Sequence, residues 1–440
     1  MNPKTAPLTR RKFSRACLAA GAAPLVLPGR VRARPSANDR ITVGMLGVGR
    51  QAYHANMPAF LHMPDVQVVA VCDVDDWRLQ NARKRVETHY AEQRPSGGYR
   101  GCAVYRDFRE MLARPDIDAV MISTQDHWHV PMSLAAIEAG KDVSLEKPIT
   151  VSIREGRLLC DAVARYSRVF RTDSEFRSRD RFRRACELVL NGRIGTLRRI
   201  RTGAPASDRA CPPQPAQPVP EELDYDLWLG PAPRTPYTEK RVHPRKGYGR
   251  PGWMRVRDYC DGMISNWGTH LNDIAQWGNG TQTTGPVEIE GTGTYPDDGL
   301  WDVLTGFEVT YRYANGVEML YTYSHPHVRF EGTEGWVQAD LGGRGLTASS
   351  PAILNAPIGA GDIHLPAKTD KRDFIDAVKT RGATMETAEI GHRTTTVCHL
   401  GHIAIQVGRR LRWDPDAEVF PDDPEANRML DRPRRAPWVI

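Results

Sequence analysis

The sequence predicts an α/β protein built from two parts. Over residues 40–170, short apolar runs typical of strands alternate with helical patterns, as in a parallel sheet with helices on both faces. From residue 171 to residue 440, strand-like runs and turn signals dominate. The chain has 440 residues, which is enough for two domains with large cores. We therefore expect one domain over 40–170 and a second over 171–440, preceded by a leader.

The first 33 residues have the three regions of an export leader. A basic start contains the twin-arginine motif Thr9-Arg10-Arg11-Lys12-Phe13, an apolar run covers 16–27, and small residues follow at 31–33. The apolar run is too short to span a bilayer, which takes about 20 residues. We expect a signal peptide over 1–33, export by the twin-arginine machinery to the periplasm or the exterior, and no stable membrane insertion afterwards.

Loss of this leader would change the charge of the protein. The whole chain has 60 basic and 53 acidic side chains, a formal net charge of +7. Residues 1–33 hold seven of the basic side chains and none of the acidic ones, so 53 of each would remain. A chain without excess charge gives no reason to expect a nucleic-acid partner. We expect the arginine clusters over 177–184 and 198–201 to be solvated.

The first strand-turn-helix unit carries a glycine pattern. An apolar strand leads into Gly47-Val48-Gly49-Arg50-Gln51-Ala52, and a second strand ends at Asp73. This spacing is typical of a βαβ unit that binds a dinucleotide at a helix N-terminus. Gly47 would permit the tight turn, and Gly49 would let the backbone approach the pyrophosphate. A carboxylate at Asp73 would accept ribose hydroxyls and repel a 2′-phosphate, which favours NAD over NADP.

The alternation of strands and helices continues to residue 171. We expect strands over 119–123, 142–145 and 169–171, and helices over 130–139 and 151–166. Ligands of such sheets lie beyond the carboxyl ends of the strands. The expected cofactor contacts are therefore Gly47, Gly49, Arg50, Gln51, Asp73, Thr124, His127, His129, Glu146 and Lys147.

Four motifs together resemble those of the Gfo/Idh/MocA oxidoreductase family. They are the glycine loop with Asp73, the segment Ile122-Ser123-Thr124-Gln125-Asp126-His127-Trp128-His129, the triplet Glu146-Lys147-Pro148, and Gly268-Thr269-His270-Leu271-Asn272-Asp273. The likeness runs from about residue 41 to the C-terminus and is greatest to the exported branch. It implies a Rossmann domain followed by an α/β domain with a large, mostly antiparallel sheet, which often forms the oligomer contact. A homo-oligomer is the corresponding expectation.

The second part of the sequence independently contains strands for such a sheet. Ala314-Asn315-Gly316 predicts a hairpin turn between two of them, and 387–411 predicts a helix. Residues 203–256 are rich in proline and glycine and too long for a simple connection; such loops are usually functional or disordered. Aromatic residues in this loop would either cover a sugar or anchor the core: Tyr225, Trp228, Tyr248 and Trp253. The expected strands are 197–202, 287–293, 307–313, 317–323 and 335–339.

The resemblance implies that Lys147 and His270 carry the chemistry. In the family, the lysine lies near the nicotinamide and the substrate hydroxyl, and the histidine acts as acid or base on that hydroxyl. Hydride leaves carbon only as the hydroxyl proton is removed. Many members have an aspartate four residues before the histidine, whereas this chain has Asn266, which could orient the ring but not stabilise an imidazolium by charge. Asp273 could supply that charge or bind substrate hydroxyls.

Two histidines flank Trp128 in the second motif. His127 and His129 could form a metal site, but no third ligand with suitable spacing appears, and we expect no metal. Cofactor contact and core packing are the remaining interpretations. The pairs His325 and His327, and His399 and His402, are equally ambiguous.

The sequence leaves the reaction open. The simplest interpretation is an NAD-dependent oxidoreductase acting on a secondary hydroxyl of a sugar, glycoside or cyclitol. An exported enzyme has no obvious soluble NAD pool, so the cofactor would have to stay bound and be recycled in place. Epimerisation, hydride transfer between two sugars, and glycosidic cleavage after transient oxidation would all satisfy this; cleavage is known for some family members. A non-catalytic exported sugar-binding protein is a further alternative.

Overall fold

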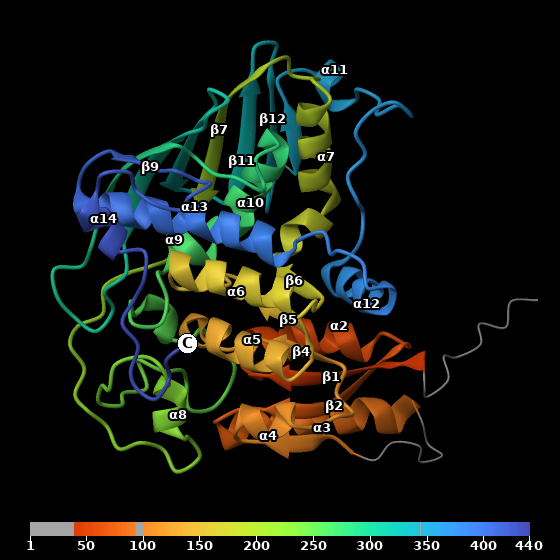
Figure 1. Cartoon of the computed structure of the whole chain (residues 1–440), viewed down its shortest axis with the longest axis vertical. Helices are drawn as coiled ribbons and strands as arrows, with labels where there is room; N and C mark the ends of the chain where they lie inside the picture. The colour runs from red at the N-terminus through yellow and green to blue at the C-terminus, as the bar shows by residue number, and fades with distance from the viewer. Residues whose placement is uncertain (1–38, 94–100, 344) are drawn as a thin grey trace, which may run out of the picture.

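The computed structural model describes residues 39–93, 101–343 and 345–440; the predicted leader over 1–33 lies outside them. The chain forms two sheets, one above the other in Figure 1. The lower sheet has six strands and the upper sheet has eight. Among the described residues, no helix combines the length and the apolar character needed to cross a membrane.

The lower sheet is parallel throughout. Its strands are β1 (Ile41–Leu46), β2 (Val66–Cys72), β3 (Ala103–Tyr105), β4 (Ala119–Ile122), β5 (Asp142–Glu146) and β6 (Phe170–Asp173). They lie in the order β3-β2-β1-β4-β5-β6, so the direction of winding reverses between β1 and β4. In such sheets the crevice at this reversal is where ligands bind.

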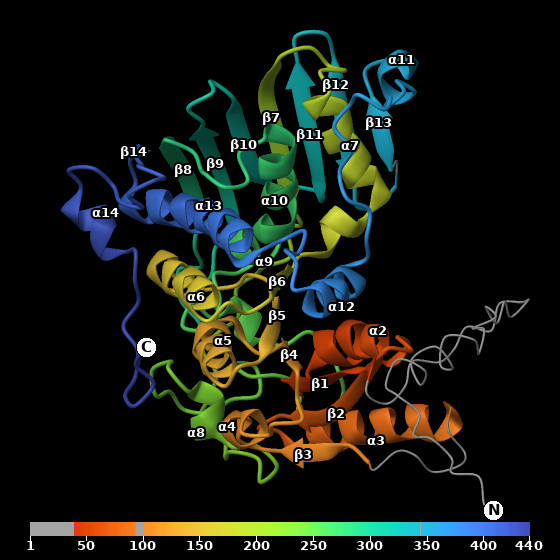
Figure 2. The same ribbon diagram turned by 45° about the vertical axis from the view of Figure 1, so that its right-hand side comes forward.

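Helices cover both faces of the lower sheet, as Figure 2 shows. One apolar cluster contains side chains of α2 (Met57–Leu61), α3 (Asp76–Gln93) and α12 (Asp370–Thr380). The other contains side chains of α4 (Phe108–Leu112), α5 (His129–Glu138) and α6 (Ile153–Arg165). The predicted parallel sheet with helices on both faces is confirmed. Strand β3 was not predicted, because three residues are too few to show an apolar pattern.

The upper sheet is mostly antiparallel, as the family resemblance implied. Its strands are β7 (Leu197–Ala204), β8 (Glu288–Thr294), β9 (Gly306–Arg312), β10 (Glu318–Tyr323), β11 (His327–Gly332), β12 (Trp336–Asp340), β13 (Leu346–Ala348) and β14 (Leu411–Arg412). The order is β13-β12-β11-β7-β10-β9-β8-β14, and among the described strands of this sheet only β7 and β10 pair in parallel. Helices α7 (Asp180–Leu190), α10 (Gly268–Asn279) and α13 (Ala388–Val407) pack on one face.

In the second part, some helices and strands begin and end where the sequence predicted and others do not. The predicted hairpin at 314–316 joins β9 to β10. The predicted helix over 387–411 ends earlier, at Val407, because Gly408 takes a left-handed conformation and Leu411 pairs with β8. Strand β11 was not predicted, because it has only two apolar residues, Val328 and Phe330, which are too few to show a pattern.

Two segments of the second part return to the lower sheet. The proline-rich connection after β7 contains the short helix α8 (Tyr225–Leu229) and forms its own apolar cluster around Trp228 and Tyr259. The C-terminal segment, residues 424–440, begins with α14 (Pro424–Arg428) and descends beside the lower part of the molecule (Figure 2). Both segments therefore connect the two sheets.

Candidate functional site

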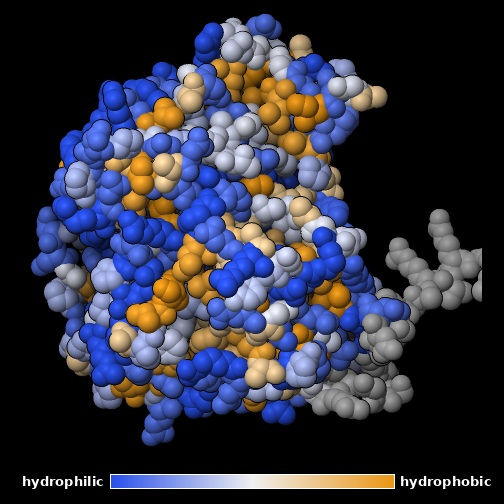
Figure 3. Space-filling view, in the orientation of Figure 1, coloured by the Kyte–Doolittle hydropathy of each residue, from blue (hydrophilic) through white to orange (hydrophobic). Residues whose placement is uncertain are grey.

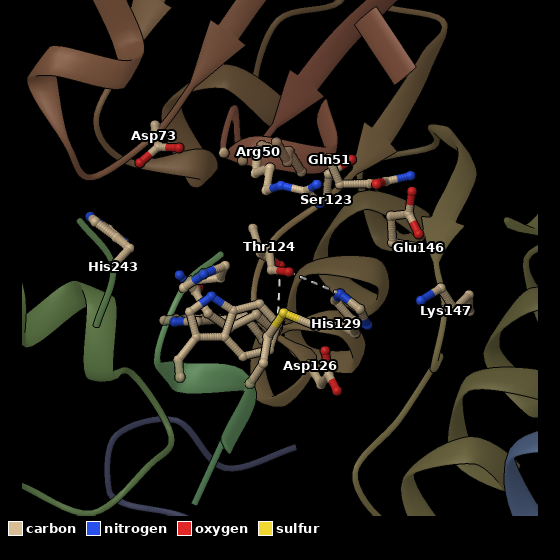
Figure 4. Close-up of a pocket in the computed structure, with 18 of the residues that line it drawn as sticks. Arg50, Gln51, Asp73, Ser123, Thr124, Asp126, His129, Glu146, Lys147 and His243 are labelled. Atoms are coloured by element: carbon tan, nitrogen blue, oxygen red, sulfur yellow. Dashed lines mark hydrogen bonds between the residues drawn. The ribbon is translucent and has the colours of Figure 1, made fainter. Parts of the chain in front are cut away.

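A cavity of about 330 Å³ lies at the carboxyl ends of β1, β4 and β5, and residues of the second part close it from the other side. The glycine loop and Asp73 form one region of its wall, and Lys147 and His270 form another. Figure 4 shows several of these side chains converging on the cavity. The predicted site residues in the wall are Gly47, Gly49, Arg50, Gln51, Asp73, Thr124, His129, Glu146, Lys147, Asn266 and His270; His127 and Asp273 are not among its lining residues.

The two glycines of the loop serve different purposes. Gly47 has a φ of +78°, and a Cβ there would lie 2.8 Å from the backbone oxygen of Ser123. Only glycine fits that position without strain. A Cβ at Gly49 would meet nothing within 4 Å, so its missing side chain leaves open space. The loop therefore has room for a phosphate group to approach its backbone.

Asp73 is held in place directly beside this loop. The backbone N–H of Val48 donates to Oδ2 at 2.8 Å, and the N–H of Asp75 donates to Oδ1 at 3.0 Å. Burial, together with repulsion by Asp75, raises the pKa of the Asp73 carboxyl to about 6. The fixed carboxylate and the open loop fit the adenosine ribose and the pyrophosphate of NAD.

Lys147 and Glu146 are anchored at the end of β5. The Lys147 Nζ donates to the backbone oxygen of Asn266 at 3.1 Å. The Asn56 Nδ2 donates to Glu146 Oε1 at 2.8 Å and to Ser123 Oγ at 2.9 Å. Glu146 and Lys147 lie side by side, on the opposite side of the view from Asp73 (Figure 4). These contacts place the ammonium group between the lower sheet and the helix that carries His270.

His270 is buried but lines the cavity. Its ring stacks on Phe176, with centroids 4.5 Å apart. Ser174 Oγ donates to the backbone oxygen of Thr269 at 3.5 Å and lies 3.4 Å from His270 Nδ1. Burial, with added repulsion from Lys147 and Arg179, lowers the pKa of His270 well below its usual range. A neutral ring with its hydrogen on Nδ1 would therefore present the lone pair of Nε2 as a base.

The polar side chain that contacts the ring of His270 belongs to Ser174, not to Asn266 as expected. The ring of His270 is contacted by the serine hydroxyl, whereas Asn266 contributes its backbone oxygen to Lys147. Asp273 is fully buried and accepts two hydrogen bonds from Arg177, at 2.8 and 2.6 Å. The structure therefore does not bring Asp273 to the cavity. The expectation that Arg177 is solvated is wrong, because its guanidinium is the buried counter-ion of Asp273.

The two histidines of the second motif separate in space. His129 Nδ1 lies 2.7 Å from the backbone oxygen of Pro148, and Nε2 lies 3.3 Å from that of Thr124, which ties the two cavity loops together. Burial lowers its pKa to about 4. His127 instead packs beside Trp228, with Nε2 3.1 Å from the backbone oxygen of Leu229. Its predicted cofactor contact is not supported by this position. No three potential metal ligands cluster within the described ranges.

Several residues of the wall were not predicted. Asp126 is buried, and burial raises the pKa of its carboxyl to about 7. It lies inside the second motif, so its place in the sequence was a usable signal. Phe176 and Trp267 lie against the ring of His270, and nothing local in the sequence indicated that these rings come together. Trp253, one of the aromatic residues of the proline-rich loop, also belongs to the wall.

Family models match both parts of the chain. The model described as "Oxidoreductase family, NAD-binding Rossmann fold" matches residues 41–174, and "Oxidoreductase family, C-terminal alpha/beta domain" matches residues 212–440. A curated relative from a Shewanella species, "Glycosyl hydrolase family 109 protein 1", is 33% identical over 131 residues. That match covers 29% of this chain and 27% of the relative, so the chain spans about a quarter of the relatives' length.

Solved structures share the fold at low identity. An aldose-aldose oxidoreductase from Caulobacter crescentus has a TM-score of 0.61 and 18% identity, covering 85% of this chain and 99% of that one. Scyllo-inositol dehydrogenase from Lactobacillus casei, solved with NAD(H) and scyllo-inositol, has a TM-score of 0.60 and 17% identity over the same shares. With both domain models matched and a cavity that fits the dinucleotide, the chain belongs to the Gfo/Idh/MocA oxidoreductase family, and its cofactor is NAD.

Proposed function

We propose that the protein oxidises a secondary hydroxyl of a sugar, glycoside or cyclitol and that the reduced cofactor is reoxidised without leaving. One observation carries this proposal: Lys147 and His270 line the same cavity as the glycine loop and Asp73. When bound, NAD would supply the hydride acceptor. The protein must then bind the hydroxyl, accept its proton and return that proton in the reverse step.

His270 and Lys147 divide the handling of the proton. His270 is neutral at neutral pH, so its Nε2 can accept the hydroxyl proton directly. One N–H of the Lys147 ammonium is bound to the backbone oxygen of Asn266. Its other N–H groups remain to stabilise the alkoxide oxygen that develops during oxidation. The same two groups serve the return step, since the reaction is reversible.

Two tryptophans of the cavity wall support a carbohydrate or cyclitol as the substrate. Trp253 and Trp267 are partly exposed and present rings on which the apolar C–H faces of a sugar can pack. Glu175 and Arg179, joined at 2.8 Å, add polar groups to the same wall. Two of the structural neighbours act, by their titles, on aldoses and on an inositol.

A second candidate is redox-neutral cleavage of a glycosidic bond after transient oxidation. The curated relatives named as family 109 glycosyl hydrolases favour it. Cleavage needs an acid for the leaving group besides the base that serves oxidation. Asp126, a wall residue with a pKa near 7, would be protonated often enough to act as that acid.

The cellular setting rests on the sequence. The twin-arginine motif Thr9-Arg10-Arg11-Lys12-Phe13 and the small residues at 31–33 support export of the folded, cofactor-loaded chain to the periplasm or the exterior. We include a homo-oligomer in the proposal because the family resemblance implies one. Replacing both motif arginines by lysine and measuring the exported fraction tests the location.

The deciding experiment is the recovery of cofactor from protein purified without added nucleotide. Bound NAD, identified by mass and absorbance, together with turnover of a sugar substrate that needs no external NAD⁺, is the expected result. A requirement for stoichiometric external NAD⁺, with NADH accumulating, would contradict recycling in place. Release of an aglycone from a glycoside selects cleavage over net oxidation. Sugar binding without any turnover would leave the non-catalytic alternative.

A further inference from the structure

A loop of the second part covers one end of the cavity. We call residues 242–254 the cover loop. His243 Nε2 lies 3.0 Å from Asp75 Oδ2, and Arg78 Nη1 donates to the same oxygen at 2.7 Å. The other arm of the Arg78 guanidinium donates to the backbone oxygens of Pro244 at 2.8 Å and Gly247 at 3.3 Å. The loop is thus fastened to the corner that follows Asp73.

Tyr248 adds aromatic contacts to the attachment of the cover loop. Its ring stacks on Tyr53, with centroids 4.1 Å apart and planes at 14°. It also lies 5.3 Å from the ring of Trp77. Tyr53 follows the glycine loop, and Trp77 follows Asp73. Tyr248 therefore bridges the two elements that are expected to hold the pyrophosphate and the ribose.

The cover loop also faces the cavity itself. His243, Tyr248, Gly249 and Pro251 belong to the same wall as Asp73. Figure 4 shows His243 on a separate segment below Asp73, with the cavity between that segment and Lys147. The Tyr248 hydroxyl is buried and has no hydrogen-bond partner among the residues that the structure describes. Buried hydroxyls are normally paired, so an unpaired one in a cavity wall indicates a ligand acceptor.

We propose that the cover loop is a clamp over the dinucleotide and that Tyr248 is a cofactor-binding residue. This inference rests on the proposed function, since it concerns the NAD that is recycled in place. The hydroxyl donates to a ribose or phosphate oxygen of the cofactor, and the ring closes the groove above it. Because the loop is held by the buried pair of Asp75 and Arg78, the cofactor cannot leave until the loop moves. Tyr248 and the loop therefore set how long NAD stays bound.

The test measures the dissociation of NADH from the full-length protein. Protein loaded with NADH is mixed with a large excess of NAD⁺, and the loss of bound-NADH fluorescence gives the dissociation rate. Tyr248→Phe keeps the stacked ring and removes only the hydroxyl; we expect it to release NADH about three- to tenfold faster. Tyr248→Ala also opens the groove and should release it at least tenfold faster. Lys246→Ala, an exposed position in the same loop, is the matched control and should stay within twofold.

The outcomes separate the clamp from the proposed function. If the wild-type protein binds NADH but Tyr248→Phe and Tyr248→Ala release it at the wild-type rate, the clamp is wrong and the proposed function stands. If the wild-type protein binds no NADH, both fail. Tyr248→Phe remains informative even if Tyr248→Ala does not fold, because it retains the stacking on Tyr53.

Discussion

Lys147 and His270 are held by different kinds of contact. The Lys147 ammonium is fixed by a backbone oxygen, whereas the His270 ring is fixed by stacking on Phe176 and by the hydroxyl of Ser174. The backbone contact survives most substitutions of Asn266, because any residue supplies a carbonyl there. Asparagine in place of aspartate at position 266 therefore leaves the contact of Lys147 unchanged.

The first residue-scale prediction concerns these two groups. We expect His270→Gln and Lys147→Met each to lower kcat by about 10²- to 10⁴-fold, because the first removes the proton acceptor and the second removes the ammonium that stabilises the alkoxide. NADH binding should persist, since the glycine loop and Asp73 are unchanged. The control is His364→Ala, an exposed histidine away from the cavity, which should keep wild-type turnover. Turnover within fivefold of wild type in both site variants would refute the assignment.

The second residue-scale prediction concerns pH and Asp73. Ribose hydroxyls donate to the ionised carboxylate, whose pKa is raised to about 6. The affinity for NADH should therefore be highest at neutral pH, where Asp73 is ionised. It should fall as the pH drops through about 6, by up to about tenfold per pH unit. Asp73→Asn should bind weakly with no such pH dependence. The measurement is the NADH dissociation constant, obtained from fluorescence titrations between pH 5 and pH 8 in steps of about half a pH unit. Equal affinity across this range would count against the ribose contact.

The roles of single residues were harder to predict from the sequence than the fold or its elements. Lys147, His270, Asp73 and the two loop glycines were placed because each lies in a local motif. Asp273 also lies in a motif, yet its partner Arg177 is 96 residues away, and no local pattern records that pairing. The same holds for Ser174, which meets His270 across the same sequence separation. Contacts between distant segments decide which motif residues reach the cavity.

At the scale of elements, the glycine loop offers a matched pair of tests. Gly47→Ala should lower the free energy of unfolding by about 1–3 kcal/mol, because its φ of +78° is strained for alanine and the Cβ would crowd Ser123. Gly49→Ala should change stability by less than about 0.5 kcal/mol, since its Cβ meets nothing. It should nevertheless weaken NADH binding at least about tenfold, because the methyl group occupies the space left for the phosphate. Thermal unfolding measures the change in stability, and NADH titration measures the change in affinity. Unchanged NADH binding by Gly49→Ala would show that the phosphate does not occupy that space.

Elements were predicted well wherever the apolar pattern was long. The strands of the lower sheet and the hairpin between β9 and β10 followed directly from alternation and turn residues. The errors have local causes: β3 is too short, and the apolar Leu411 was counted in a helix that Gly408 had already ended. Residues 203–256, which contain the cover loop, are too long for a simple connection, but the contacts of the loop with Asp75 and Tyr53 could come only from the folded chain.

At the scale of the whole molecule, the C-terminal segment fastens the two parts together. Arg434 pairs with Glu155 of α6 in the first part at 2.9 Å. Arg432 pairs with the buried Asp261 of the second part, which His399 and His402 also contact. Burial opposes ionisation of Asp261, but Arg432 and the two histidines outweigh it and hold its pKa well below its usual range. Figure 3 shows that this face of the molecule is mostly hydrophilic, with apolar patches between hydrophilic side chains. The attachment therefore rests on arginines that reach from the surface to buried carboxylates.

Removing one partner of this pair should destabilise the whole protein. We expect Arg432→Met to lower the free energy of unfolding by about 3 kcal/mol, because Asp261 would keep a buried charge with fewer counter-ions. Arg428→Ala, an exposed arginine in the same segment, is the control and should cost less than about 0.5 kcal/mol. Chemical denaturation followed by tryptophan fluorescence measures both. Equal stability of the two variants would show that the segment is not fastened through Asp261.

The route of the chain also fixes an order of assembly during synthesis. Trp438 packs against Trp128 with ring centroids 4.7 Å apart, and His243 reaches back to Asp75 from 168 residues further along the chain. The nucleotide-binding half therefore leaves the ribosome with its groove open and one aromatic pair incomplete. The groove can close once the cover loop has emerged, whereas the aromatic pair must wait for nearly the last residues. A chain that stops before residue 242 lacks the loop that finishes the groove, so the first part depends on synthesis of the second to hold the cofactor.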